Sequence, residues 1–305
     1  FTSKALEGEI AVRNIHRREG DTDVYFVANL ARRSGSASCA FAVSGRRPEL
    51  WDPVRGTMRD LGEYSMKNGR TTVPLKFDDS ESFFVVFRKP VPADATAPAG
   101  RNSPDLTTVA ELPGPWIVRF DPAWGGPKAA VFEELEDWTQ RKENGIRYYS
   151  GTACYECLFD KPAGIVGAAR VWLDFGTVYD LAQIRLNGRD LGIFWTAPWR
   201  AEITTTLKPV DNCLEIRVTN TWANRLIGDE QEPADCEWGR GDQGFGGPLK
   251  VFPEWTLKRL PRPSTGRYTF TTWNYFAKDS PLLPAGLLGP VTFQLHSPRS
   301  TVLVR

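Results

Sequence analysis

Apolar and polar residues alternate with a period of two along most of the chain. In residues 212–219, for example, Leu214, Ile216 and Val218 alternate with Glu215 and Arg217. Successive side chains of a β-strand point to opposite faces, so this pattern predicts a half-buried strand with one solvated face.

A tight hairpin is predicted at Asn187-Gly188, which separates two strand-like runs. Both residues tolerate positive φ, and the pair is the favoured centre of a two-residue β-hairpin. The pairing places Ile184 and Leu186 on one face and Arg185 on the other.

Short strands of this kind fill two regions, which predicts an all-β protein of two β-sandwich domains. The first domain is an antiparallel sandwich over residues 1–89, and the second is a jelly roll over residues 115–305 that includes a strand in "YTFTTWNYF" (268–276). Residues 90–114 are rich in Pro and Ala and predict a linker. One helix is expected in "VFEELEDWTQ" (131–140), covering an end of the second sandwich.

Length and charge narrow the classes of function. The 305 residues are ample for two cores. With 38 Lys and Arg against 37 Asp and Glu, no net field attracts nucleic acid, and no apolar run approaches the roughly 18 residues that span a bilayer. Eleven Trp and eight Tyr favour a neutral partner with flat C–H faces, such as a carbohydrate, although most of these rings are expected in the cores.

Cysteine spacing argues against a metal or redox site. Cys154 and Cys157 form a CxxC pair, but residues i and i+3 of a strand point to opposite faces. No second CxxC or histidine pair completes a zinc site, so the five cysteines are interpreted as buried free thiols. The chain begins at Phe1 without an initiator Met or a signal-peptide pattern, and we expect it to be an engineered piece, a processed product or a fragment of a longer protein.

Longer motifs along the chain resemble those of known protein families. "LDFGTVYDLAQIRLNGRDLGIFWTAPWRAEIT" followed by "NCLEIRVTNTWANRLIGDEQ" resembles the galactose-binding-like sandwich that accompanies family 2 glycosidases. "IHRREGDTDVYFVAN", "GRRPELWDPVRG", "YYSGTACYE" and "FTTWNYFAKDSPLLPAGLLGPVTF" resemble the C-terminal region of the α-L-rhamnosidases of glycoside hydrolase family 106. The resemblance covers essentially the whole chain in a consistent order.

The resemblance implies a part of an enzyme of polysaccharide degradation, secreted or periplasmic, whose catalytic (β/α)₈ barrel is absent here. The acid and base carboxylates would lie in that barrel, so the chain is expected not to be catalytic alone. Its partners would be a rhamnose-containing or other plant or microbial polysaccharide, and the barrel of the parent protein. No cofactor is expected, although sandwiches of this kind leave room for a structural calcium ion.

Three segments rich in polar and aromatic residues are the candidates for binding carbohydrate or for docking the barrel. They are "FWTAPWR" (194–200), "TNTWANRLIGDEQ" (219–231) and "TTWNYFAKDSPLLPAGLLGP" (271–290). In "TNTWANRLIGDEQ", taken as a loop, Arg225 could instead form an internal clamp with Asp229 or Glu230. In "FWTAPWR", one of the two Trp rings could plug the end of the core. The candidate residues are Trp195, Trp199, Arg200, Asn220, Trp222, Asn224, Arg225, Asp229, Glu230, Trp273, Asn274 and Tyr275.

Three functions remain open from the sequence. The chain could be a portion that binds carbohydrate or supports the enzyme, a hydrolase in its own right with a site at the domain interface, or a docking scaffold for the barrel.

Overall fold

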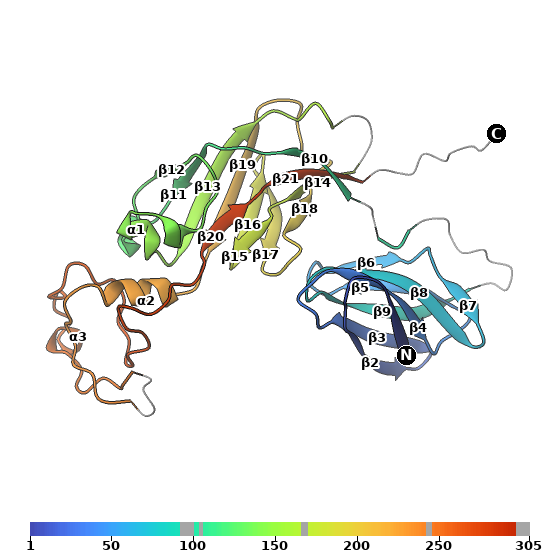
Figure 1. The fold of residues 1–305 in the computed structure, drawn as a ribbon, viewed down its shortest axis with the longest axis horizontal. Helices are drawn as coiled ribbons and strands as arrows, with labels where there is room; N and C mark the ends of the chain where they lie inside the picture. The colour runs from blue at the N-terminus through green and yellow to red at the C-terminus, as the bar shows by residue number, and fades with distance from the viewer. Residues whose placement is uncertain (92–100, 104–105, 166–169, 242–245, 297–305) are drawn as a thin grey trace. The chain divides into compact units, whose positions relative to one another are not determined.

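The computed structural model describes residues 1–91, 101–103, 106–165, 170–241 and 246–296 (Figure 1). The chain divides into two compact units, Phe1–Leu106 and Thr107–Arg305. Antiparallel strand pairs build the sheets of both units, which confirms the predicted all-β class.

The first unit is a sandwich of two sheets. Its four-stranded sheet has the order β1-β4-β8-β7, and its five-stranded sheet has the order β2-β3-β9-β5-β6. The inner faces meet in one core, where the Tyr25 ring of β3 meets the Phe41 ring of β4 edge to face at 4.9 Å between centroids. The strands are β1 Thr2–Glu7, β2 Val12–Glu19, β3 Thr22–Asn29, β4 Gly35–Phe41, β5 Arg46–Asp52, β6 Thr57–Asp60, β7 Ser65–Lys67, β8 Arg70–Phe77 and β9 Ser82–Pro90.

The second unit packs a six-stranded sheet, β12-β11-β13-β19-β16-β17, against a four-stranded sheet, β10-β21-β14-β18, with β15 and β20 as a separate pair. The strands are β10 Leu106–Glu111, β11 Trp116–Arg119, β12 Ala130–Phe132, β13 Thr152–Phe159, β14 Arg170–Asp174, β15 Thr177–Tyr179, β16 Leu181–Leu186, β17 Arg189–Phe194, β18 Arg200–Glu202, β19 Asn212–Thr219, β20 Gly286–Gly289 and β21 Thr292–His296. The helical turns are η1 Pro122–Trp124, η2 Trp138–Gln140, α1 Asn144–Arg147, α2 Ala223–Asp229 and α3 Glu254–Leu257.

The strand pattern around the hairpin is confirmed. Asn187 and Gly188 both have positive φ, and they connect β16 to β17. Ile184 and Leu186 are fully buried while Arg185 is exposed. On the neighbouring β19, the alternating apolar residues are buried in the same core.

The end of the predicted linker differs in the structure. Residues 92–100 and 104–105 lie outside the described ranges, but Leu106–Glu111 forms β10 and joins the second unit through β21. Leu112 is buried in the same core. The Pro and Ala content of the segment masked the strand-forming Thr and Val residues at its end.

Two predicted elements are wrong. The helix expected over residues 131–140 is instead strand β12 followed by the single turn η2, where Trp138 is fully buried and its Nε1 donates to the Tyr155 hydroxyl at 2.5 Å. The strand expected over residues 268–276 forms only an isolated bridge between Trp273 and Pro248. Its Thr and aromatic residues have strand propensity, but among the described residues no neighbouring strand runs alongside it.

Candidate functional site

The segment taken as a loop from its sequence contains helix α2. Its buried residues include Asn224, Arg225 and Asp229, which are polar, and Ile227. A helix whose buried face is polar has no apolar stripe, so periodicity in the sequence gave no signal for it.

The buried Arg225 and Asp229 side chains form the first of the two clamps that the sequence allows. Arg225 Nε donates to Asp229 Oδ1 at 2.9 Å across one helical turn, and the side chains are only 6% and 3% exposed. The guanidinium also lies 4.9 Å from the centre of the Tyr268 ring. Glu230 pairs with Arg267 instead, at 3.0 Å.

Asp229 also organises the chain that follows α2. Its Oδ2 accepts the Tyr268 N–H at 3.0 Å, and the Thr269 N–H and hydroxyl at 2.6 Å each. The carboxylate therefore holds residues 268–269 in place through three hydrogen bonds, outside any sheet. The described part of residues 230–283 is called the extension below.

A second, partly buried ion pair lies within the extension. Arg262 Nε donates to Asp235 Oδ2 at 2.5 Å, and the Ser264 hydroxyl donates to the same oxygen at 2.7 Å. Burial by itself raises the pKa of Asp235, but the hydrogen bonds from Arg262 and Ser264 outweigh it and bring the pKa down to about 2. For the neighbouring Cys236, burial and the Asp235 charge raise the thiol pKa to about 11.

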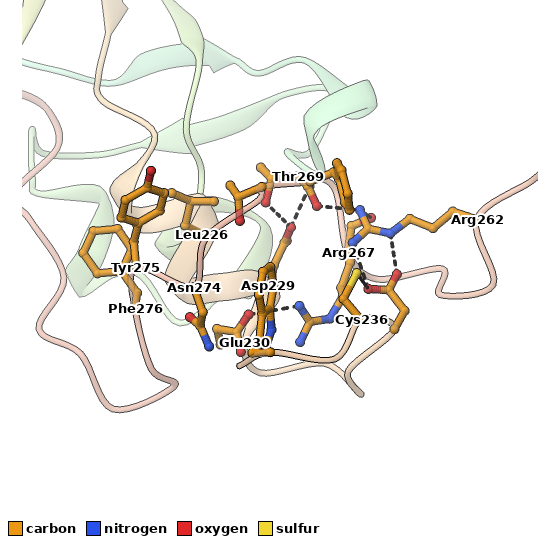
Figure 2. A pocket seen from close by; sticks show the side chains of 14 residues that line it. Leu226, Asp229, Glu230, Cys236, Arg262, Arg267, Thr269, Asn274, Tyr275 and Phe276 are labelled. Atoms are coloured by element: carbon orange, nitrogen blue, oxygen red, sulfur yellow. Dashed lines mark hydrogen bonds and ion pairs between the residues drawn. The ribbon is translucent and has the colours of Figure 1, made fainter. Parts of the chain in front are cut away.

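These groups surround a small cavity (Figure 2). Its volume is about 20 Å³, which is room for about one water molecule rather than a sugar ring. The three carboxylates in its wall, those of Asp229, Glu230 and Asp235, each pair with an arginine. A glycosidase acid needs a raised pKa, and Asp235 has the opposite shift, so the cavity is a structural polar cluster.

Asn220 and Asn224 are also structural. The Asn220 amide accepts the Gly151 N–H and donates to the Tyr149 carbonyl, both at 2.9 Å. The Asn224 amide donates to the Leu283 carbonyl at 2.7 Å and accepts the Leu283 N–H at 2.8 Å. Each amide therefore joins distant segments through both of its polar atoms.

Trp195 and Trp199 are not brought together as a platform. Trp199 packs against the core of the second unit, whereas Trp195 is 58% exposed. This arrangement matches the alternative in which one of the two rings plugs the core. Arg200 lies in β18 opposite Asp174.

Trp222, at the start of α2, forms an exposed aromatic pair with a residue that the sequence analysis missed. Its ring meets the Trp124 ring of η1 edge to face, with centroids 4.9 Å apart. Trp222 is 50% exposed and Trp124 is 36% exposed. The Tyr268 ring, which is 37% exposed, lies against the backbone of Gly125, the residue after Trp124, because a Cβ added there would be 2.7 Å from the ring.

Trp273, Asn274 and Tyr275 lie in the extension. Trp273 bridges to Pro248, and the Asn274 N–H donates to the Gly247 carbonyl at 2.9 Å. Asn274 and Tyr275 line the small cavity, and Tyr275 is 65% exposed (Figure 2).

Within the described ranges, no cluster of three His, Cys, Asp or Glu residues is arranged to hold a metal ion. Cys154 and Cys157 point to opposite faces of β13, as the strand pattern predicts. No helix in the described part of the chain is long and apolar enough to cross a membrane.

Comparisons with known proteins match both units. Residues 2–66 match the family model of glycoside hydrolase family 106, described as α-L-rhamnosidase, and residues 134–247 match the model described as glycosyl hydrolase 2 galactose-binding domain-like. The solved structure of a rhamnosidase from Novosphingobium sp. PP1Y is 33% identical with a TM-score of 0.78, covering 96% of this chain and 24% of that one.

A curated protein of Formosa agariphila, named "Putative beta-glucuronidase", is 38% identical over 192 residues, which cover 61% of this chain and 16% of the relative. The chain thus spans about a quarter or less of the length of the proteins it matches.

The β-sandwich fold and the match over residues 134–247 define the second unit as a galactose-binding-like domain of the glycoside hydrolase type. With the match over residues 2–66 and the rhamnosidase structure, the chain is similar to a portion of the α-L-rhamnosidases of glycoside hydrolase family 106.

Proposed function

We propose that the chain is the carbohydrate-binding or supporting C-terminal portion of a rhamnosidase-like glycoside hydrolase that acts on plant or microbial polysaccharide. The carbohydrate-binding surface is the aromatic platform formed by Trp124, Trp222 and Tyr268. The catalytic carboxylates of the parent enzyme lie outside this portion.

The exposed Trp124–Trp222 pair is the observation that supports this proposal. An edge-to-face contact at 4.9 Å fixes both rings, so little side-chain entropy remains to be lost when a ligand binds. The Arg225 guanidinium packs against the Tyr268 ring, 4.9 Å from its centre. Rigid aromatic rings that keep an exposed face suit stacking against the C–H face of a sugar.

Titration calorimetry with rhamnose-containing oligosaccharides tests the proposal. Trp222→Ala and Trp124→Ala should each weaken binding about tenfold, equivalent to roughly 1.4 kcal/mol. Trp195→Ala is the matched control, since Trp195 is even more exposed than Trp222 but has no ring contact with a described residue. Unchanged affinity in both platform variants would refute the proposed platform, and no heat with any glycan would refute carbohydrate binding.

A docking scaffold for the catalytic barrel is the second candidate, favoured by the apolar surface of the extension. Val251, Leu257 and Leu260 are each more than half exposed, although α3 is only one turn long. Exposed apolar side chains that form a contiguous patch are typical of interaction surfaces, and these three lie within ten residues of the sequence. Leu257→Ser in the whole parent enzyme should weaken association of the extension with the barrel if this candidate is correct, which limited proteolysis would detect.

The third candidate, a hydrolase in its own right, predicts release of reducing sugar by this chain alone. Release that a single Asp or Glu substitution abolishes would replace our proposal. An extracellular polysaccharide substrate also implies a secreted or periplasmic protein, which cell fractionation tests in the source organism.

A further inference from the structure

A second hollow lies beside α2. Its walls are formed by residues of α2, α1 and η2 and by residues 278–282. Its volume is about 390 Å³, within the range of roughly 300–1,000 Å³ for ligand pockets in proteins. It is about twenty times larger than the cavity in Figure 2. Residues of chemical interest in its wall are Gln140, Arg147, Tyr148, Ile227, Lys278 and Asp279.

The walls of this hollow are fixed by contacts between segments far apart in sequence. Gly228 lets α2 approach Tyr148 closely, because a Cβ at this position would lie 2.5 Å from the Tyr148 Cβ. Gln231 Nε2 donates to the Lys278 carbonyl at 2.7 Å, and the Asn224 amide holds Leu283 through two hydrogen bonds. A ligand would therefore meet a preformed site.

Two cations in the wall have no partner for their charge among the residues that the structure describes. The Arg147 guanidinium lies 5.6 Å from the centre of the Tyr148 ring, but it makes no hydrogen bond or ion pair with any residue in the described ranges. The Lys278 ammonium group likewise has no side-chain partner among those residues. Both groups are therefore available to bind an anion.

The remaining wall groups suit a hydroxyl-rich molecule. The Asp279 carboxylate reduces the formal charge of the lining to one positive unit, and it can accept hydrogen bonds from hydroxyl groups. Gln140 adds an amide that donates and accepts, while Tyr148 and Ile227 give an apolar surface. An arginine binds a carboxylate or a similar anion through two parallel hydrogen bonds.

We infer that this hollow binds a sugar unit that carries one anionic group, with Arg147 and Lys278 on the anion and Tyr148 against the ring. A uronic acid carboxylate and a sulfate ester share this chemistry. The inference rests on the proposed carbohydrate-binding function, but it assigns that function a second site and a requirement for charge.

Calorimetry of this chain with digalacturonic acid and with its neutral methyl ester isolates the charge. The acid should bind at least tenfold more tightly than the ester, and its affinity should fall with added salt. Galactose 6-sulfate against galactose is the second arm, and the larger charge preference identifies the anion that the site takes.

Arg147→Ala and Lys278→Ala should remove most of the preference for the acid, whereas Arg185→Ala, an exposed arginine on β16, should keep it. Arg147→Lys should retain part of this preference, because lysine keeps the positive charge but lacks the planar guanidinium group that forms two parallel hydrogen bonds. Circular dichroism confirms that each variant is folded.

Two results would overturn the inference in distinguishable ways. If glycans bind with no charge preference and Arg147→Ala changes nothing, the hollow is not the site, while the proposed function stands. If no glycan binds at all, both the hollow and the proposed function are refuted.

Discussion

Replacing Asp229 with Asn tests whether the buried clamp holds α2 and the extension together. The Asp229 carboxylate accepts one hydrogen bond at Oδ1, from Arg225, and three at Oδ2. An amide has only one accepting oxygen. Its best orientation keeps the oxygen toward Tyr268 and Thr269 and turns the NH₂ group toward the Arg225 N–H.

The magnitude follows from this geometry. One charge-assisted hydrogen bond is lost, worth about 1.5–3 kcal/mol. Arg225, which is 6% exposed, also loses its counter-charge, and breaking a buried pair in this way costs about 3–5 kcal/mol in total. The contact with the Tyr268 ring remains and offsets part of that loss.

Native-state hydrogen exchange is the assay, because the extension can open while the sandwich stays folded. Peptides covering residues 223–231 and 267–272 should exchange about a hundredfold faster or more in Asp229→Asn, since each 1.4 kcal/mol is a factor of ten. Glu254→Gln is the matched control. It breaks the Lys258–Glu254 pair of α3, which has the same i,i+4 spacing but whose side chains are 63% and 69% exposed. The exchange rates of the same two peptides should therefore change less than about threefold.

If the exchange rate of these peptides rises less than tenfold in Asp229→Asn, or no more than in the control, the reasoning is refuted. A double-mutant cycle with Arg225→Met then isolates the pair. The Arg225→Met change removes the buried charge that Asp229→Asn leaves unpaired, so the double variant should be more stable than the sum of the single changes predicts.

Four further outcomes are expected. Gly228→Ala should destabilise the protein to urea by about 1–3 kcal/mol, because the new Cβ would lie 2.4 Å from the Arg225 guanidinium; a gain of about 1 kcal/mol would mean that helix propensity decides instead. Asn187→Ala should lower the melting temperature more than Asn187→Gly, since both lose the side-chain hydrogen bonds but only alanine is strained at φ 54°. Asp235 has a folded pKa of about 2, below its ordinary value of 3.8, so it adds about 2 kcal/mol to the free energy of unfolding. This contribution is complete above pH 4 and is lost as the pH falls toward 2. In Asp235→Asn, the loss of stability over this pH range should be absent from an acid titration. Burial raises the pKa of Cys39 to about 12, so a thiol reagent at pH 8 should leave it unmodified until the first unit unfolds, and rapid labelling of the native protein would contradict that expectation.

Sequence reasoning succeeded where the partner of each residue is implied by local spacing. The alternation in residues 212–219 and the Asn187-Gly188 turn define faces and pairing within a few residues, and the structure confirms both. The Arg225–Asp229 clamp is one of the two pairings that the sequence allows, although the segment was taken as a loop; on helix α2 the i,i+4 spacing brings the two side chains together.

Features that depend on distant partners were missed. Trp124 became part of a candidate site only through Trp222, nearly a hundred positions later. Residues 268–269 are held by the Asp229 carboxylate rather than by a neighbouring strand, so strand propensity predicted a sheet where none is described. The helix expected near Trp138 failed because that ring is buried against Tyr155 at the end of the sandwich.

The irregular strand β17 has a consequence for solubility. It is an outer strand of the six-stranded sheet, where unpaired backbone groups could recruit a strand from another molecule. The register shifts opposite Ile184 and Arg185, Gly192 has a φ of 109°, and the Asp190 carboxylate accepts the Gly192 N–H at 2.8 Å. Part of the edge is therefore already hydrogen-bonded and bent, which protects the domain against amyloid-like growth at high concentration.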